Sequence, residues 1–264
     1  HRWMRIRESS GTVFLETAPD GATWTTRGMA ATPSWAQYAF TNIFAGSDGA
    51  VTNGGTATWQ HLNNDSVTGV RCPSSSLSDD FSDGTQSDAW LRSQSDNCTM
   101  TEESPGQLDF ALEPAQSYCE YISSYAYDLT GNAVFVQVPK APTKADGAVA
   151  WLRVVDNENE ASGYEISVDE GTLQFVHKNP DGSSTVQATK VYNGNTDGWW
   201  RIRESNGTVF YESGSDGKTW NVSASEPVSL PVTAVGTHLG VSVYDQAATS
   251  PGHVDFANLN IAPQ

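Results

Sequence analysis

A short stretch near the C-terminal end places two arginines, an acid and two aromatic residues at alternate positions. Trp199, Arg201 and Arg203 alternate with other residues, and Phe210 and Glu212 follow a turn in the same alternation. Arginine and carboxylate groups hydrogen-bond to hydroxyl groups, and aromatic rings pack on apolar surfaces such as the C–H face of a sugar. These residue types suit carbohydrate binding. They also suit a structural Arg–Glu cross-strand pair, which would contribute about 0.2–1 kcal/mol.

The same pattern is present a second time near residue 1. The stretch from 3 to 24 is identical to the stretch from 199 to 220 at 15 of 22 aligned positions, without a gap. The candidate carbohydrate-binding residues of the two copies are therefore Trp199, Arg201, Arg203, Phe210, Glu212, Trp3, Arg5 and Arg7.

The spacing of these residues predicts a β-hairpin. Asn206-Gly207 favours a two-residue type I′ turn, because both central residues of that turn need positive φ. The register then places Arg203 opposite Phe210. It also places Arg201 opposite Glu212. The other face of the hairpin is apolar and should belong to the core; it carries Trp200, Ile202, Val209 and Tyr211.

The rest of the chain also predicts strands. Apolar and polar residues alternate in short runs such as 107–112, 133–138, 164–168 and 238–243, and turn residues separate the runs. Many short strands punctuated by Gly, Asn and Asp are typical of an antiparallel sandwich or barrel. Helical periodicity is nearly absent, so we expect an all-β protein.

The repeat also predicts the domain organisation. Residues 79–264 should form a complete domain, in which a long stretch precedes the hairpin. Residues 1–63 hold only the hairpin and a similar last strand, so we expect the C-terminal part of a first domain, with residues 64–78 as a linker. A third of a sandwich leaves an apolar face and strand edges uncovered. We therefore expect a longer natural chain, or else another chain, to complete the first copy.

Composition excludes some classes of protein. The formal net charge of −17 and the pI of about 4.4 argue against nucleic-acid binding, which needs clustered Lys and Arg. No apolar run approaches the roughly 20 residues of a membrane helix, so no membrane insertion is expected. Cys98 and Cys119 lie in strand-like sequence and form a candidate disulfide, which leaves Cys72 free or bonded outside the chain.

Several motifs together resemble one superfamily. They are "DDFSDG" at 79–84, "GAVAWLRVVDNENEASGYEISVDEGTLQFV" at 147–176, the hairpin from 199, and "VDFANL" at 254–259. The pattern resembles the concanavalin A-like lectin/glucanase superfamily, above all the laminin-G-like modules of bacterial extracellular and phage proteins. The resemblance implies a jelly-roll β-sandwich of two antiparallel sheets, as a tandem repeat whose first copy is incomplete. It leaves the function open, because this fold hosts lectins, hydrolases, adhesins and structural modules.

The resemblance also implies where catalytic acids would lie. Glucanases of this superfamily place acidic residues at alternate positions on one strand. The nearest match is "EISVDE", in which Glu165 and Asp169 share a face but Ser167 stands between them. Retaining hydrolysis needs two carboxyl groups about 5 Å apart. The alternative, which we favour, is a strand edge followed by the hairpin turn Asp169-Glu170-Gly171.

Acidic loops often bind ions in the same superfamily. Asp79, Asp80 and Asp83 open the second domain, and Asp255 lies on its last strand. Hard cations such as Ca²⁺ take several oxygen ligands, often from loops. These four aspartates are the candidate calcium site, and solvated loop carboxylates are the alternative. No other cofactor is expected.

These observations lead to three functional hypotheses. We expect a module without enzymatic activity, located outside the cell, at the cell surface or on a virion, that binds glycans or cell-surface polysaccharide and serves adhesion. The alternative is a structural repeat domain of a phage tail, a capsid decoration or a cell-surface filament, assembled into a larger particle without a small ligand. A glycoside hydrolase is the third hypothesis.

Overall fold

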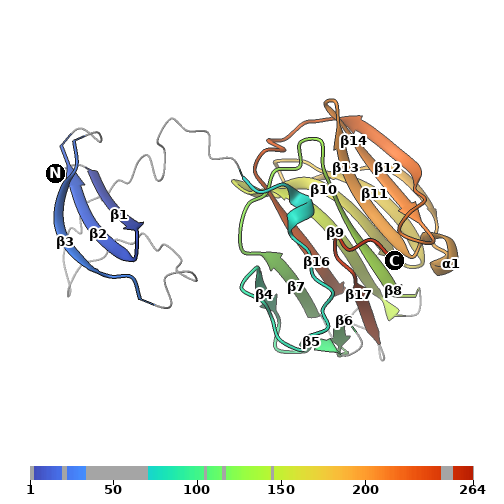
Figure 1. Cartoon of the computed structure of the whole chain (residues 1–264). Coiled ribbons are helices and arrows are strands. Elements are labelled where there is room, and N and C mark those ends of the chain that lie inside the picture. Colours follow the sequence, from blue (N-terminus) through green and yellow to red (C-terminus); the bar gives the residue numbers. More distant parts are fainter. Residues whose placement is uncertain are drawn as a thin grey trace, which may run out of the picture. The chain divides into compact units, whose positions relative to one another are not determined.

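The computed structural model describes residues 3–19, 23–33, 71–103, 106–114, 117–143, 146–244 and 252–263. The chain divides into two units, His1–Asp65 and Ser66–Gln264. Figure 1 shows the strands of both units. Within the described ranges, no helix has the length and hydropathy that crossing a membrane requires.

The first unit holds a three-stranded antiparallel sheet with the strand order β1-β2-β3. Its strands are β1 (Trp3–Ser9), β2 (Thr12–Ala18) and β3 (Thr25–Ala31). Ser10 and Gly11 both have positive φ, at 53° and 78°, as a type I′ turn between β1 and β2 requires. Arg5 lies opposite Glu16, which is the register that the sequence predicts for this kind of hairpin.

The second unit is a sandwich of two seven-stranded antiparallel sheets. Sheet I has the strand order β12-β11-β10-β9-β16-β7-β4, and sheet II has the order β15-β14-β13-β8-β17-β6-β5. Sheet I consists of β4 (Trp90–Gln94), β7 (Ser117–Ser123), β9 (Ala148–Asp156), β10 (Asn159–Asp169), β11 (Thr172–Lys178), β12 (Ser184–Val191) and β16 (Val235–Val243). Sheet II consists of β5 (Cys98–Glu103), β6 (Gln107–Leu112), β8 (Ala133–Lys140), β13 (Trp199–Ser205), β14 (Thr208–Gly214), β15 (Asn221–Pro227) and β17 (His253–Ala257). Two short turns of helix are η2 (Ser74–Ser76) and α1 (Gly194–Asp197).

This architecture confirms the predicted all-β jelly-roll sandwich. Side chains at alternate positions of both sheets meet between them and form one core. The predicted apolar face of the second hairpin is part of it, since Trp200, Ile202, Val209 and Tyr211 are all fully buried. Fully burying one such large apolar side chain contributes about 1.5–3 kcal/mol.

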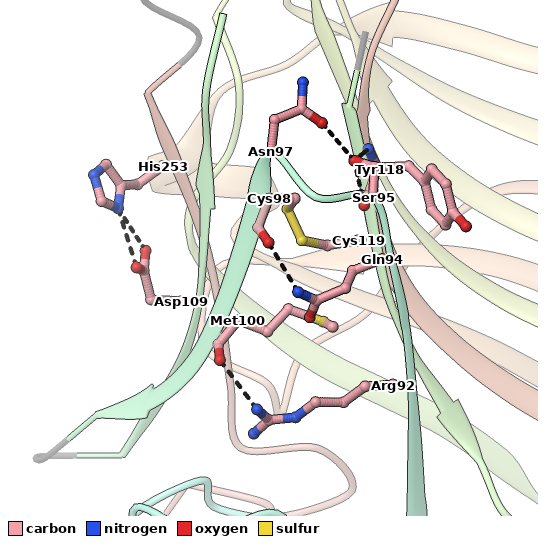
Figure 2. Close-up of a disulfide and its surroundings, with 10 residues drawn as sticks. All are labelled: Arg92, Gln94, Ser95, Asn97, Cys98, Met100, Asp109, Tyr118, Cys119 and His253. Atoms are coloured by element: carbon pink, nitrogen blue, oxygen red, sulfur yellow. Dashed lines mark hydrogen bonds and ion pairs between the residues drawn. A yellow bond between two sulfur atoms is a disulfide. The ribbon is translucent and has the colours of Figure 1, made fainter.

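A disulfide joins the two sheets at one end of the sandwich. Cys98 on β5 is bonded to Cys119 on β7, with their Cα atoms 6.0 Å apart, as Figure 2 shows. Next to it, the side chain of Gln94 donates a hydrogen bond to the Cys98 carbonyl at 3.1 Å. Cys72 is free and exposed.

Residues 71–78, the described end of the predicted linker, are hydrogen-bonded to the sandwich. The Ser74 amide donates to the Asp128 carbonyl at 2.7 Å, and Leu77 is buried. The amide group of Asn260 donates to the carbonyls of both Ser74 and Leu77. The end of the predicted linker, from residue 71, is therefore held against the last strands. The predicted last strand of the first copy, 57–63, lies outside the described residues.

Candidate functional site

The hairpin β13–β14 carries the predicted mixed face, and its polar groups bind one another. Glu212 is buried and accepts hydrogen bonds from both Arg201 and Arg203. The guanidinium carbon of Arg201 lies 4.3 Å from the ring centre of Trp220. That of Arg203 lies 4.2 Å from the ring centre of Phe210. We call this network of Arg201, Arg203, Glu212, Phe210 and Trp220 the ladder. Its charged groups and aromatic rings already contact one another within the protein.

Trp199 does not present its ring to solvent. Only 4% of the residue is exposed, and its ring centre lies 6.3 Å from that of Phe135. The turn at Gly217 packs so closely on it that an added Cβ would lie 2.9 Å from a ring atom of Trp199. The sequence predicted this tryptophan as a sugar-stacking residue, and its burial by the Gly217 turn removes the surface on which a sugar would stack.

The first copy repeats the ladder. Arg5 and Arg7 both donate to Glu16, at 2.9 and 3.2 Å. The guanidinium of Arg5 lies 4.1 Å from the ring centre of Trp24, the equivalent of Trp220. Hydrogen bonds from Arg7 and Arg5 keep the pKa of Glu16 low despite the loss of solvation. Trp3 is half-buried at the start of β1. Repetition of the whole network in two hairpins favours a structural role for it.

A second polar cluster lies on the outward face of sheet I and escaped the sequence analysis. We call it the platform; it consists of Glu120 on β7, Trp151 and Arg153 on β9, Glu165 on β10 and His238 on β16. The strand register puts all five side chains on one face, because Glu165 pairs with Arg153, Arg153 with His238, and Gly240 with both Trp151 and Glu120.

Arg153 stands at the centre of the platform. It donates hydrogen bonds to Glu165 and, through Nη1 at 3.3 Å, to Glu120. Nδ1 of His238 lies 3.9 Å from Glu120, and Nζ of Lys178 lies 3.9 Å from Glu165. Burial would raise the pKa of Glu120, but its interactions with His238 and Arg153 outweigh burial and lower it. Glu120 is therefore an ionised acceptor at neutral pH.

Trp151 is the platform residue whose polar atom is only weakly engaged. Its indole N–H is buried and interacts with the Glu120 carboxylate, but it makes no hydrogen bond of ordinary geometry among the described residues. The ring lies directly over Gly240, where an added Cβ would come within 2.6 Å of two ring atoms. The Arg153 guanidinium covers the ring at 4.1 Å from its centre. A ligand or water oxygen that accepts from this N–H with better geometry would therefore be favourable here.

Exposed tyrosines lie beside the platform. Tyr118 is 43% exposed and lies two positions from Glu120 on the same face of β7. Tyr244 follows β16, is 41% exposed, and donates from its hydroxyl to Asp169 on β10 at 2.6 Å. A flat polar surface with aromatic rings at its border can hold a ligand that carries both hydroxyl groups and apolar C–H faces.

The acids suggested for hydrolysis from the sequence are not a pair. Glu165 and Asp169 share a face of β10, but four residues of strand separate them by about 13 Å. Glu165 binds Arg153, whereas Asp169 accepts from Tyr244. The carboxylate that does approach Glu165 is Glu120, since both lie on the guanidinium group of Arg153.

The predicted calcium ligands lie in two different places. Asp79, Asp80 and Asp83 each accept hydrogen bonds from the backbone of their own loop, two residues further on. Asp255 lies elsewhere, on β17, directly opposite Asp109. In the ranges that the structure describes, no group of three or more His, Cys, Asp or Glu side chains is placed to hold a metal ion. Calcium binding therefore stays a prediction.

Asp255 belongs instead to a carboxylate pair on sheet II. It lies with Asp109, His253, Lys140 and Gln107 around an open hollow of about 220 Å³. Nδ1 of His253 lies 2.9 Å from Asp109, as Figure 2 shows. Burial, together with the neighbouring Asp109, raises the pKa of Asp255 to about 6. Sequence analysis did not find this pair, because 146 positions separate the two aspartates.

Comparison with solved structures identifies the fold. A laminarinase from Flavobacterium sp. UMI-01 aligns with a TM-score of 0.53 and 8% identity, over 69% of this chain and 98% of that chain. SCLam, a non-specific endo-beta-1,3(4)-glucanase from family GH16, aligns with a TM-score of 0.50 and 10% identity, over 69% of this chain and 89% of that chain. The chain has the concanavalin A-like jelly-roll fold.

A carbohydrate-binding module, CBM66 from Bacillus subtilis, also aligns, with a TM-score of 0.40 and 14% identity, over 67% of this chain and 96% of that chain. No protein-family model and no curated protein sequence matches this concanavalin A-like chain.

The comparison contradicts the prediction that the protein is not an enzyme. Both of the solved structures above with TM-scores of at least 0.50 are glucan-degrading enzymes by name. At 8–10% identity the likeness shows the fold and not the activity. The inference from this jelly roll to a protein without catalysis was therefore wrong, because the same sandwich carries hydrolases.

Proposed function

We propose that the protein acts on carbohydrate and binds a glycan on the outward face of sheet I, over the platform. The observation that carries the proposal is the buried indole N–H of Trp151, which interacts with Glu120 but makes no hydrogen bond of ordinary geometry among the described residues. Around it, Arg153 and His238 offer donors and Glu120 an ionised acceptor, the combination that binds vicinal hydroxyl groups. Exposed Tyr118 supplies a stacking surface.

The location outside the cytosol follows from the same proposal. The disulfide Cys98–Cys119 links the two sheets, and disulfides persist in oxidising compartments. Polysaccharides of cell walls and cell surfaces are found there. A carbohydrate-active protein with this bond would meet its ligand outside the cell.

Titration with a soluble β-1,3-glucan, laminarin, tests the proposal, and a glycan array extends the test to other sugars. Tyr118→Ala and Trp151→Phe should each weaken binding about five- to tenfold, since one stacking contact or one hydrogen bond is worth about 1 kcal/mol. Val222→Ala is the matched control, because Val222 is an exposed residue on β15 of the other sheet. An affinity for laminarin that is unchanged in both Tyr118→Ala and Trp151→Phe would refute the proposal.

Glycoside hydrolysis is the second candidate activity at the same face. The favouring observation is that Glu120 and Glu165 both lie on the guanidinium of Arg153. This brings two carboxylates into the range of separations, about 5 to 9.5 Å, that glycosidases use. Release of reducing ends from laminarin, lost in Glu165→Gln but kept in Val222→Ala, would establish it. Binding without release of reducing ends would leave glycan binding alone.

A further inference from the structure

The outward face of sheet I has few positive charges. The cationic side chains on the strands of this sheet are Arg92, Arg153, Lys178 and Lys190. Arg92 pairs with Tyr121 of the core and donates to its hydroxyl at 2.8 Å, so it lies on the inner side. Lys190 pairs with buried Leu173 and binds Asp197 at 2.6 Å, which also places it on the inner side. Of the strand residues of sheet I, only Arg153 and Lys178 are left to meet an anion on the outward face.

Both of these cations lie against one carboxylate, that of Glu165. Arg153 donates a hydrogen bond to it, and Nζ of Lys178 lies 3.9 Å from it. A second carboxylate, Glu120, accepts from Nη1 of Arg153 at 3.3 Å. Asp169 shares the face of Glu165 on β10. The positive charges on this face are therefore already compensated by carboxylates.

The burial of Glu165 makes these ion pairs difficult to exchange. Its side chain is 7% exposed, whereas that of Arg153 is 25% exposed. An anion that binds Arg153 competes with Glu165 and leaves that carboxylate buried with less counter-charge, which is strongly unfavourable. A hydroxyl group requires no such exchange. It can donate to the carboxylate oxygens and leave the ion pairs in place.

Glu120 acts in the same direction as Glu165. As an ionised carboxylate it accepts hydrogen bonds and donates none. A ligand beside it must therefore offer O–H groups, which a uronate carboxylate or a sulfate ester lacks at neutral pH. The formal net charge of −17 on the whole chain also repels polyanions at longer range.

Resting on the glycan binding proposed above, we infer that the platform selects uncharged glycans over uronic-acid-containing and sulfated ones, and that Glu165 sets this selection. Proteins bind carboxylate and sulfate groups through arginine and lysine side chains. Glu165 occupies Arg153 and Lys178, so neither is available for that purpose. Selectivity of this kind depends on a repulsive element as well as on attractive contacts.

Two derivatives of laminarin with matched degrees of substitution, carboxymethyl and hydroxyethyl, test the inference. The wild type should bind the charged derivative about tenfold more weakly, since like charges a few ångströms apart oppose binding to that extent. Raising the salt concentration from about 0.05 M to about 0.5 M should remove most of the difference, because salt screens exposed charges. Equal affinities at low salt would overturn the inference and leave glycan binding in place. If the wild type binds neither laminarin nor its derivatives, the proposed glycan binding itself is wrong.

A pair of variants tests the role of Glu165. Glu165→Gln keeps the shape of the side chain and releases Arg153 and Lys178, so the preference for the hydroxyethyl over the carboxymethyl derivative should fall about fivefold. Glu113→Gln is the matched control, because it removes the same charge from an exposed residue that follows β6 on sheet II. It should keep the preference of the wild type. An equal change in both variants, or an unchanged preference in a folded Glu165→Gln protein, would overturn the role of Glu165.

Discussion

The guanidinium of Arg153 lies 4.1 Å from the ring centre of Trp151, two positions away on the same face of β9. The contact places a positive charge on the face of an indole whose buried N–H interacts with Glu120 but makes no hydrogen bond of ordinary geometry among the described residues. Two carbons of the ring also lie close to Gly240, where an added Cβ would come within 2.6 Å of them. The ring is thus held by an arginine and by the backbone of β16, which orients its N–H in advance of any ligand.

Gly240→Ala should displace Trp151. The added methyl group would lie 2.6 Å from two ring atoms of Trp151 and 2.7 Å from a side-chain carbon of Glu120. Overpacking of this kind costs about 1–3 kcal/mol. Urea unfolding should show the loss, and laminarin binding should fall with it. Ser242→Ala, at the next outward position of β16, is the control and should change neither. An unchanged midpoint in Gly240→Ala would show that the ring does not lie on Gly240.

Reduction of the disulfide should destabilise the sandwich. The bond between Cys98 and Cys119 closes a loop with a sequence separation of 21 residues. A crosslink of that length is worth about 3 kcal/mol through the entropy of the unfolded chain. Denaturant unfolding with and without a reductant measures the difference. Cys72→Ser should behave as the wild type in both conditions, because Cys72 is exposed and free. A reductant that leaves the midpoint unchanged would count against the bond.

Stability should depend on pH through Asp255. Its pKa is raised to about 6 in the folded protein from an ordinary value of 3.8. Its contribution to stability is therefore complete below pH 3.8 and is lost as pH rises through 6. The group is only partly buried, so solvent screening should keep the effect to about 1 kcal/mol. The free energy of unfolding of Asp255→Asn, compared with that of the wild type, should therefore be higher at pH 7 than at pH 4.

Asp109 supplies the control for that titration, because the neighbouring carboxylate is the second cause of the raised pKa after burial. Asp109→Asn should shrink the pH dependence while Asp255 is still present. Denaturant unfolding between pH 4 and 8 measures both variants. A pH dependence that survives in Asp255→Asn would assign it to another group.

Glu212→Gln should lower the stability of the protein without changing its affinity for glycan. The carboxylate is 2% exposed and accepts hydrogen bonds from Arg201 and Arg203, so its neutral analogue leaves two guanidinium groups without a counter-charge. A loss of about 1–3 kcal/mol is expected. Thermal unfolding gives the stability and laminarin titration the affinity. A lower affinity for laminarin in a folded Glu212→Gln protein would contradict this and would indicate that the ladder takes part in glycan binding.

The sequence alone predicted those features that depend on neighbouring residues in the chain. The Asn-Gly turn and the alternation after it gave the register of β13–β14 and its buried face, and the strand-like context of Cys98 and Cys119 gave the disulfide pair. Burial of Trp199 was missed, because the covering turn at Gly217 comes from later in the chain. Alternation alone marks which residues share a face but not which other segment will cover that face.

The platform could not be predicted in the same way. Its residues come from β7, β9, β10 and β16, and the order in which those strands lie in sheet I is not the order of the sequence. Glu120 and Glu165 meet on Arg153 only because β16 is inserted between β7 and β9. Gly240 lies opposite Trp151 and leaves room for its ring, but this can be recognised only once the pairing of β16 with β9 is known.

The indole N–H resonance of Trp151 tests the central claim most directly. In an amide-proton NMR spectrum the signal is assigned by its absence in Trp151→Phe, and laminarin oligosaccharides are then added. Binding at the platform predicts that this resonance shifts progressively with glycan, in step with the affinity measured by titration, while the indole signals of buried Trp199 and Trp200 stay in place. A glycan that binds and leaves the Trp151 signal unmoved would contradict the account.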